Sequence, residues 1–252
     1  MGILKRLFPK RDDIVCISYP KSGRTWVRFA LNVAGADVVF KHGGYASRDP
    51  DDLGYEFEGI KPQIFGKRNI FLHRNPLDTA VSEFYQIPNR IFNPEHPDFE
   101  RMTTRLKAEN KLPPTDVNEF VLHPIWGIPK ICKFNAAHID YFKDRKNAYI
   151  VRYEDLRQQP ETHFVELLEF CRVKDFDIDQ VLADSSFENM KKIELSASPE
   201  VRKEHKLYGM KDGDENTMKV RKGKVAGYKD ELSEATIAAG REICLQYGLQ
   251  VA

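Results

Sequence analysis

The sequence predicts an α/β fold in which a parallel central sheet is flanked by helices. Four short apolar runs predict buried strands, and three of them are continuous rather than alternating, which is typical of a parallel sheet covered on both faces. Segments with apolar residues at helical spacing separate these runs. The chain has 252 residues, of which 41% are hydrophobic and 31% charged, a balance that suits one domain with a hydrophobic core.

The strands are expected at Ile14–Ser18, Val38–Lys41, Asn69–His73 and Ala148–Arg152. Helical apolar faces follow the first strand (Trp26 to Val33) and the third (Leu77 to Tyr85), and another precedes the fourth (Ile131 to Phe142). Later helices are predicted at Thr162–Cys171, Ile178–Ala183, Ser186–Ile193 and Ser233–Tyr247. This alternation implies right-handed βαβ units, with ligands bound at the carboxyl ends of the strands.

No repeat, low-complexity tract or linker divides the chain, so residues 1–252 are predicted to form a single domain. Two segments, Arg90–Pro114 and Ser196–Val225, show no clear periodicity. They are expected to be long irregular loops, either lids over a site or surface insertions.

Charge and composition exclude several classes of protein. The formal net charge is +1, so no global field attracts the chain to nucleic acid or to a membrane. No apolar run approaches the roughly 20 residues of a spanning helix, and the apolar stretch within Met1–Lys10 is too short for a signal peptide. The four cysteines are far apart and have apolar neighbours, as core residues would: Cys16, Cys132, Cys171 and Cys244. A reducing, cytoplasmic location is therefore predicted.

The segment after the first strand, Tyr19-Pro-Lys-Ser-Gly-Arg-Thr-Trp26, has the chemistry of an anion site. Gly23 lets the backbone approach a ligand, and the N–H groups at the start of the following helix attract negative charge. Lys21 adds a positive charge, while Ser22 and Thr25 add hydroxyl donors. The segment has neither the Walker A order nor a Gly-x-Gly-x-x-Gly pattern. The alternative is an ordinary strand-to-helix turn with a serine cap.

Two further segments have similar chemistry. Arg74 ends the third strand before a helix that starts at Pro76, and Ser82 lies two turns along that helix. The alternative is an Arg–Asp pair beside a solvent-facing serine. Near the C-terminus, Arg221-Lys-Gly223 lies in the basic run Lys219–Lys224, which could close over a polyanion or could be a solvated surface.

In this order, the motifs resemble those of the sulfotransferases that use 3′-phosphoadenosine 5′-phosphosulfate (PAPS) as donor. The resemblance is to the cytosolic type, in a short, bacterial-like form, and it spans roughly Ile14 to Leu232. It implies a P-loop NTPase-like, three-layer fold and the product PAP. It also implies that Lys21, Ser22, Gly23 and Thr25 hold the 5′-phosphosulfate and that Trp26 packs on the adenine. Arg24 stands where the cytosolic enzymes have threonine, and it could bind phosphate oxygens or point to solvent.

The same resemblance assigns the other end of the nucleotide. Arg74 and Ser82 would bind the 3′-phosphate together with the Arg-Lys-Gly segment, that is Arg221, Lys222 and Gly223. Tyr153 would lie near the adenine, and Ser185 and Phe187 would frame the same ring. Ser185 and Glu188 also have the spacing of a capping box, so helix capping explains that serine equally well.

His42 is the candidate base, because it follows the second predicted strand on the ligand side, where the resembling enzymes carry a catalytic histidine. A neutral imidazole can take a proton from the acceptor near neutral pH. Lys21 would stabilise charge on the leaving phosphate during in-line displacement at sulfur. The histidines show no metal-binding spacing, so no metal is predicted.

The acceptor is expected to be a small molecule with a hydroxyl or an amine. Aromatic residues suggest an acceptor pocket, although core packing explains them as well: Phe84, Tyr85, Phe92, Phe99, Phe120 and Trp126. The acidic stretch Asp49–Glu58 could select a cationic acceptor or be a solvated loop. The association patch of the cytosolic enzymes has no good match in Lys229–Gly240, so the oligomeric state stays open.

Two alternative functions remain at this point. A P-loop kinase would share the fold, but the chain has no Gly-Lys-[Ser/Thr] sequence and no clear Mg²⁺-binding acid after a strand. A non-catalytic module that binds a nucleotide or nucleic acid would have no need of His42. It would also be expected to show a basic stripe with aromatic residues.

Overall fold

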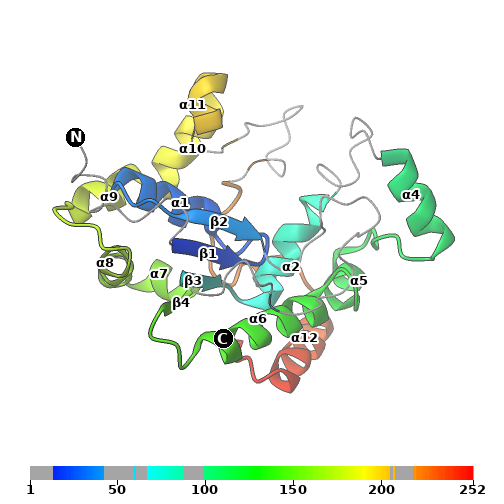
Figure 1. The fold of residues 1–252 in the computed structure, drawn as a ribbon. Helices are drawn as coiled ribbons and strands as arrows, with labels where there is room; N and C mark the ends of the chain where they lie inside the picture. The colour runs from blue at the N-terminus through cyan, green and yellow to red at the C-terminus, as the bar shows by residue number, and fades with distance from the viewer. Residues whose placement is uncertain are drawn as a thin grey trace.

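A parallel four-stranded sheet forms the centre of the part of the chain that the computed structural model describes, which is residues 14–42, 60, 67–87, 99–204, 207, 218 and 220–251. The strands are β1 (Ile14–Ser18), β2 (Val39–His42), β3 (Arg68–His73) and β4 (Ala148–Arg152), in the order β2-β1-β3-β4 (Figure 1). Each predicted strand is confirmed, with boundaries that agree to within one residue.

The register brings the ends of all four strands to one edge of the sheet. Ser18 pairs with His42 on β2 and with Leu72 on β3, and His73 pairs with Arg152 on β4. The segments that follow Ser18, His73 and Arg152 therefore leave the sheet side by side, and His42 ends its strand at the same edge. This edge is where an open α/β sheet binds its ligands.

Helices cover both faces of the sheet, which gives three layers (Figure 1). Alternate residues of a strand point to opposite faces, and both faces of β1 are buried. Val15 and Ile17 join a core with α2, α6 and α12, whereas Ile14 and Cys16 join a core with α1, α7, α8 and α9. The bounds of these helices are α1 Arg24–Val33, α2 Pro76–Phe84, α6 Ile128–Phe142, α7 Tyr153–Gln158, α8 Pro160–Phe170, α9 Ile178–Asp184 and α12 Glu234–Gln246.

Further elements are α5 (Val117–Leu122), α10 (Phe187–Ser196), α11 (Pro199–Glu204) and the 3₁₀ turn η4 (Gly227–Asp230). All four cysteines are buried as expected, and the sulfurs of Cys132 and Cys244 lie 3.5 Å apart between α6 and α12. None of the helices described is both long and apolar enough to cross a bilayer.

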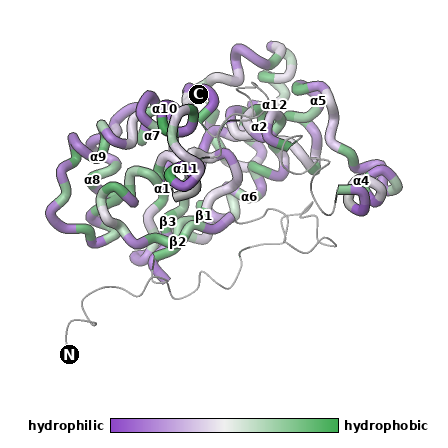
Figure 2. Tube along the Cα trace, turned by 90° about the horizontal axis from the view of Figure 1, so that it is seen from above, coloured by the Kyte–Doolittle hydropathy of each residue, from purple (hydrophilic) through white to green (hydrophobic). Residues whose placement is uncertain are grey.

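The two segments predicted as irregular each contain a helix, so that prediction was wrong in part. The two helices are α4 (Phe99–Ala108) and α11. Figure 2 shows that α4 is largely hydrophilic. Leu106 of α4 packs in a small cluster with Phe120 and Trp126, and the apolar residues Phe99, Met102 and Leu106 have the helical spacing that the sequence prediction overlooked. Glu100 in its first turn and Arg105 in its last turn also suit the helix dipole.

Candidate active site

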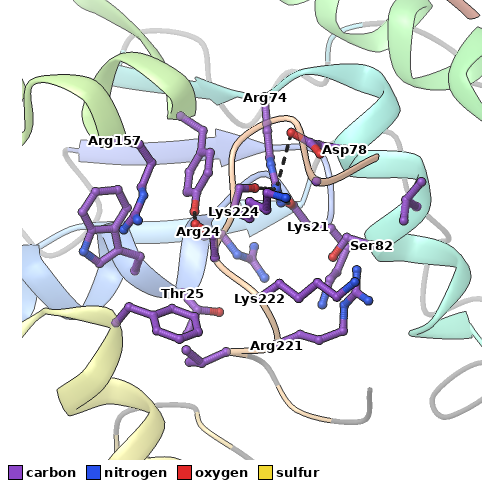
Figure 3. Close-up of a pocket in the computed structure, with 18 of the residues that line it drawn as sticks. Lys21, Arg24, Thr25, Arg74, Asp78, Ser82, Arg157, Arg221, Lys222 and Lys224 are labelled. Carbon is purple, nitrogen blue, oxygen red and sulfur yellow. Dashed lines mark hydrogen bonds and ion pairs between the residues drawn. The ribbon is translucent and has the colours of Figure 1, made fainter. Parts of the chain in front are cut away.

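One cavity at the carboxyl edge of the sheet brings together all but two of the predicted site residues (Figure 3). Both anion-binding motifs and the basic segment face this common space, which the sequence prediction required. Ser22 and Ser185 are the exceptions, because both are buried and neither lines the cavity. The predicted residues that line it are Lys21, Gly23, Arg24, Thr25, Trp26, His42, Arg74, Ser82, Tyr153, Phe187, Arg221, Lys222 and Gly223.

The loop between β1 and α1 takes a conformation that requires glycine at one position. Gly23 is the N-cap of α1 with a φ of 91°, and a Cβ there would lie 2.3 Å from Cδ2 of Tyr153. Lys21 also has a positive φ, 67°, and its Nζ donates to Oε1 of Gln86 at 2.8 Å. The Ser22 hydroxyl is buried and has no hydrogen-bond partner among the described residues.

The Arg24 side chain contacts the candidate base. Its Nη2 contacts Nε2 of His42, and Arg24 lines the cavity, so both phosphate binding and a solvent-facing position stay open for it. A guanidinium has only donors, so in this contact Nε2 of His42 is the acceptor. His42 itself is exposed at the end of β2.

Arg74 connects three segments of the site. Its guanidinium donates to the backbone carbonyls of Lys21 at 3.2 Å and Lys224 at 3.0 Å, and it stacks over the Tyr153 ring at 4.6 Å. An ion pair of 3.8 Å with Asp78, four residues along, completes its contacts (Figure 3). The fixed planar geometry of arginine suits such a multiple contact.

Asp78 anchors the basic segment to α2, a role that the sequence did not reveal. Its carboxylate accepts from the backbone N–H of Ala226 at 2.9 Å and of Tyr228 at 3.0 Å, and its side chain is almost fully buried. The sequence indicated only its pairing with Arg74. These backbone contacts span about 150 residues of chain and carry no motif, so no local pattern could have predicted them.

Aromatic side chains form one end of the cavity. Trp26 packs edge-on against Tyr153, with ring centroids 5.9 Å apart, and the Arg157 guanidinium lies 5.4 Å from its ring. The Phe187 ring lies against Gly223, where an added Cβ would be 2.5 Å from a ring carbon. Gly223 also has a positive φ of 59°. Flat apolar faces that meet cationic groups can hold a heteroaromatic base.

The turn before Phe187 differs from the predicted capping box. Ser186 is the N-cap of α10 and accepts from the N–H of Asn189, whereas the Ser185 hydroxyl donates to the carbonyl of Val181. Ser185 thus ends α9, and the cap lies one residue later than the sequence pattern indicated.

The cavity is strongly positive although the net charge of the chain is only +1. Asp78 is the sole acid among the described lining residues, and its oxygens already accept backbone N–H groups. The sequence prediction missed two of the basic side chains, Arg28 and Arg157, because they lie outside its motifs, whereas Lys224 ends the basic run that it named. This concentration of cations suits a ligand with several negative charges. The basic residues that line the cavity are Lys21, Arg24, Arg28, Arg74, Arg157, Arg221, Lys222 and Lys224.

A buried acid lies beside this cationic region. Glu83 follows Ser82 on α2, and burial raises its pKa to about 7 against the opposing effects of Lys130, a hydrogen bond from Tyr19, and Lys21. A carboxyl group next to Ser82, which lines the cavity, therefore changes its charge near neutral pH.

The aromatic residues proposed for an acceptor pocket are divided by the structure. Phe84, Phe120 and Trp126 belong to the cluster around Leu106, which favours the core-packing alternative for them. Phe92 and the acidic stretch 49–58 lie outside the described residues, as does Lys219.

Comparison with known proteins identifies the family. The family model described as "Sulfotransferase domain" matches residues 58–247. The chain belongs to the sulfotransferase family. It is thus an enzyme that transfers sulfo groups, which decides against both the kinase and the non-catalytic module.

Curated relatives agree with this membership. The sulfotransferase is 23% identical to cytosolic sulfotransferase 15 of Arabidopsis thaliana, in a match that covers 94% of this chain and 72% of the relative. It is 25% identical to the amine sulfotransferase of Oryctolagus cuniculus, over 76% of this chain and 68% of the relative.

Solved structures confirm the predicted sulfotransferase fold. Mouse sulfotransferase SULT7A1 complexed with PAP matches with a TM-score of 0.63 and 16% identity, over 95% of this chain and 85% of that one. Retinol dehydratase in complex with androsterone and PAP matches with the same TM-score and 13% identity, over 96% and 82%. At these identities, the likeness establishes the fold.

Proposed function

We propose that this sulfotransferase takes its sulfo group from PAPS and transfers it to a hydroxyl or amine of a small molecule. The observation that carries the proposal is the shared cavity, which both anion-binding motifs, the basic segment and the aromatic side chains line together. The residues fit such a nucleotide. Neither Gly23 nor Gly223, both of which line the cavity, leaves room for a side chain, so the backbone itself can approach the ligand there.

The proposed contacts divide the cavity into three regions. Lys21, Ser22, Gly23, Arg24 and Thr25 hold the 5′-phosphosulfate at the start of α1. Trp26, Tyr153 and Phe187 surround the adenine, and Ser185 supports the turn that presents Phe187. The 3′-phosphate lies among Arg74, Ser82, Arg221, Lys222 and Gly223. The eight basic side chains provide the positive charge that this polyanion needs.

PAPS supplies an activated sulfo group on a phosphate leaving group. His42 carries out the proton transfer, because it lines the cavity and its Nε2, the atom that contacts Arg24, can take the proton of the acceptor's hydroxyl or amine. The Arg24 guanidinium must first move away from Nε2 of His42, because Nε2 cannot accept the proton while it accepts the hydrogen bond from Arg24. Lys21 provides a fixed positive charge for the phosphate that gains negative charge.

The test is transfer of labelled sulfo groups from PAPS to a panel of phenols, alcohols and amines. His42→Ala is expected to bind PAP as wild type does but to lose roughly 10²–10⁴-fold in turnover, the usual contribution of a general base. His163→Ala is the matched control, since His163 lies on α8 and pairs with Glu166 at the surface. Near-normal turnover of His42→Ala would remove His42 from the mechanism.

The remaining expectations follow from the same assignment. We propose that residues 1–252 form one sulfotransferase domain that acts on a small-molecule acceptor without a metal. We also propose a cytoplasmic location, which is supported by the cytosolic sulfotransferases of Arabidopsis thaliana among its relatives.

A further inference from the structure

A single carboxylate holds both basic residues of the Arg-Lys-Gly segment. Glu231, directly after η4, accepts from Nη1 of Arg221 at 3.2 Å, and Nζ of Lys222 contacts the same oxygen. Its other oxygen accepts from the hydroxyl of Tyr85 at 2.6 Å. The Glu231 side chain is only 12% exposed. The two cations are thereby connected to the C-terminal end of α2, the helix that carries Ser82.

The Arg221 side chain is fixed on two sides. One edge of its guanidinium donates to Glu231, and its face lies over the Tyr85 ring at 4.4 Å. The side chain is 14% exposed, against 46% for Lys222. A guanidinium has five donors, so the contact with Glu231 leaves others for a ligand in the cavity that Arg221 lines.

A carboxylate at this position would by itself weaken binding of a phosphate, because like charges repel. Its benefit must come from preorganisation. A long side chain that is already immobile loses less conformational entropy when a ligand binds. The negative charge of the carboxylate also offsets the repulsion between the two adjacent cations that contact it.

We propose that Glu231, assisted by Tyr85, is a positioning residue that fixes Arg221 and so makes the site selective for adenine nucleotides that carry a phosphate on the ribose 3′-oxygen. This inference rests on the proposed function. A charged Glu231 and a neutral Tyr85 agree with this role. Burial opposes the charge on Glu231, but hydrogen bonds from Lys222, Tyr85 and Arg221 outweigh it and lower the pKa of Glu231. The pKa of Tyr85 is raised, chiefly by its hydrogen bond to Glu231.

The experiment compares PAP with adenosine 5′-phosphate, which differs from it only by lacking the 3′-phosphate. Calorimetry on Glu231→Gln is expected to show PAP affinity lower by about tenfold, or about 1.4 kcal/mol, with the affinity for adenosine 5′-phosphate changed less than about twofold. Asp230→Asn is the matched control: it removes a neighbouring acid that pairs with Lys224 at the surface, and PAP affinity should stay within about twofold.

A second variant separates the two parts of the device. Tyr85→Phe keeps a ring beneath Arg221 but removes the donor to Glu231, so it should reduce PAP affinity in the same direction by a smaller factor. Tighter binding of PAP by Glu231→Gln would show that Glu231 only competes with the phosphate and would overturn the proposal. Equal losses for both nucleotides would also overturn it, since they indicate general damage to the site. If the wild-type enzyme itself does not prefer PAP, the proposed nucleotide is wrong.

Discussion

The requirement for glycine at position 23 can be tested quantitatively. An alanine there would keep a φ of 91°, where an L-residue costs roughly 1–2 kcal/mol. Its Cβ would also overlap the Tyr153 ring, at 2.3 and 2.6 Å from two ring carbons. That ring is 5% exposed and packs against Trp26, so relief by movement adds about 1–3 kcal/mol. Gly23→Ala should therefore lower the free energy of unfolding by about 2–5 kcal/mol.

Gly35→Ala is a matched control just beyond the other end of α1. Its φ is 77°, but no atom of the described residues beyond its chain neighbours lies within 4 Å of an added Cβ. It should show the backbone cost alone, roughly 1–2 kcal/mol. The overlap can be isolated further by making Gly23→Ala in a Tyr153→Ala background, where only the backbone cost should remain.

Urea denaturation gives these free energies, and PAP calorimetry shows whether the loop still binds. The coupling between Gly23→Ala and Tyr153→Ala should be about 1–3 kcal/mol. Equal destabilisation by Gly23→Ala and Gly35→Ala, with no coupling to Tyr153, would refute the argument that the aromatic ring confines this loop.

Two further predictions concern the same edge of the sheet. Arg74→Lys keeps the positive charge but loses the planar guanidinium, which contacts two backbone carbonyls and the Tyr153 ring. The affinity for PAP, measured by calorimetry, should therefore fall roughly 10–100-fold. An unchanged affinity would show that Arg74 does not bind the phosphate. The raised pKa of Glu83, about 7 against an ordinary 4.5, means that the unfolded chain releases a proton in this range while the folded chain keeps it. Its contribution to stability is complete below about pH 4.5 and is lost as the pH rises to about 7, by roughly 3 kcal/mol. In Glu83→Gln, the free energy of unfolding measured by urea denaturation should depend less on pH between about 4.5 and 7. The same pH dependence as in the wild type would contradict the raised pKa of Glu83.

The sheet could be predicted because its strands are buried on both faces. Runs such as Ile14–Ile17 and Ile70–Leu72 have no polar side to expose, so continuous apolar sequence indicates a central parallel strand. The site motifs directly follow two of these strands. Because parallel strands end at one edge, their order along the chain was enough to place Lys21 and Arg74 in a common cavity.

The parts that could not be predicted depend on distant contacts. Asp78 binds backbone N–H groups about 150 residues away, and Glu231 reaches Tyr85 across 146 residues. The partners of Asp78 are backbone N–H groups, which every sequence has, so no residue type reveals them. In the sequence, Glu231 cannot be distinguished from a solvated carboxylate because it lies in a charged segment.

Gly23, in the loop after β1, and Gly223, in the basic segment, each let the backbone pack directly against an aromatic ring. Gly23 has a positive φ and lies against Tyr153, the first residue of α7, while Gly223 has a positive φ and lies against Phe187, the first residue of α10. Each loop can thus approach an aromatic ring more closely than any side chain would allow. The hydroxyl of Tyr153 also donates to the carbonyl of Gly223 at 3.4 Å, which joins the two loops. The aromatic wall and the anion-binding loops therefore share the same contacts, so neither can be altered without displacing the other.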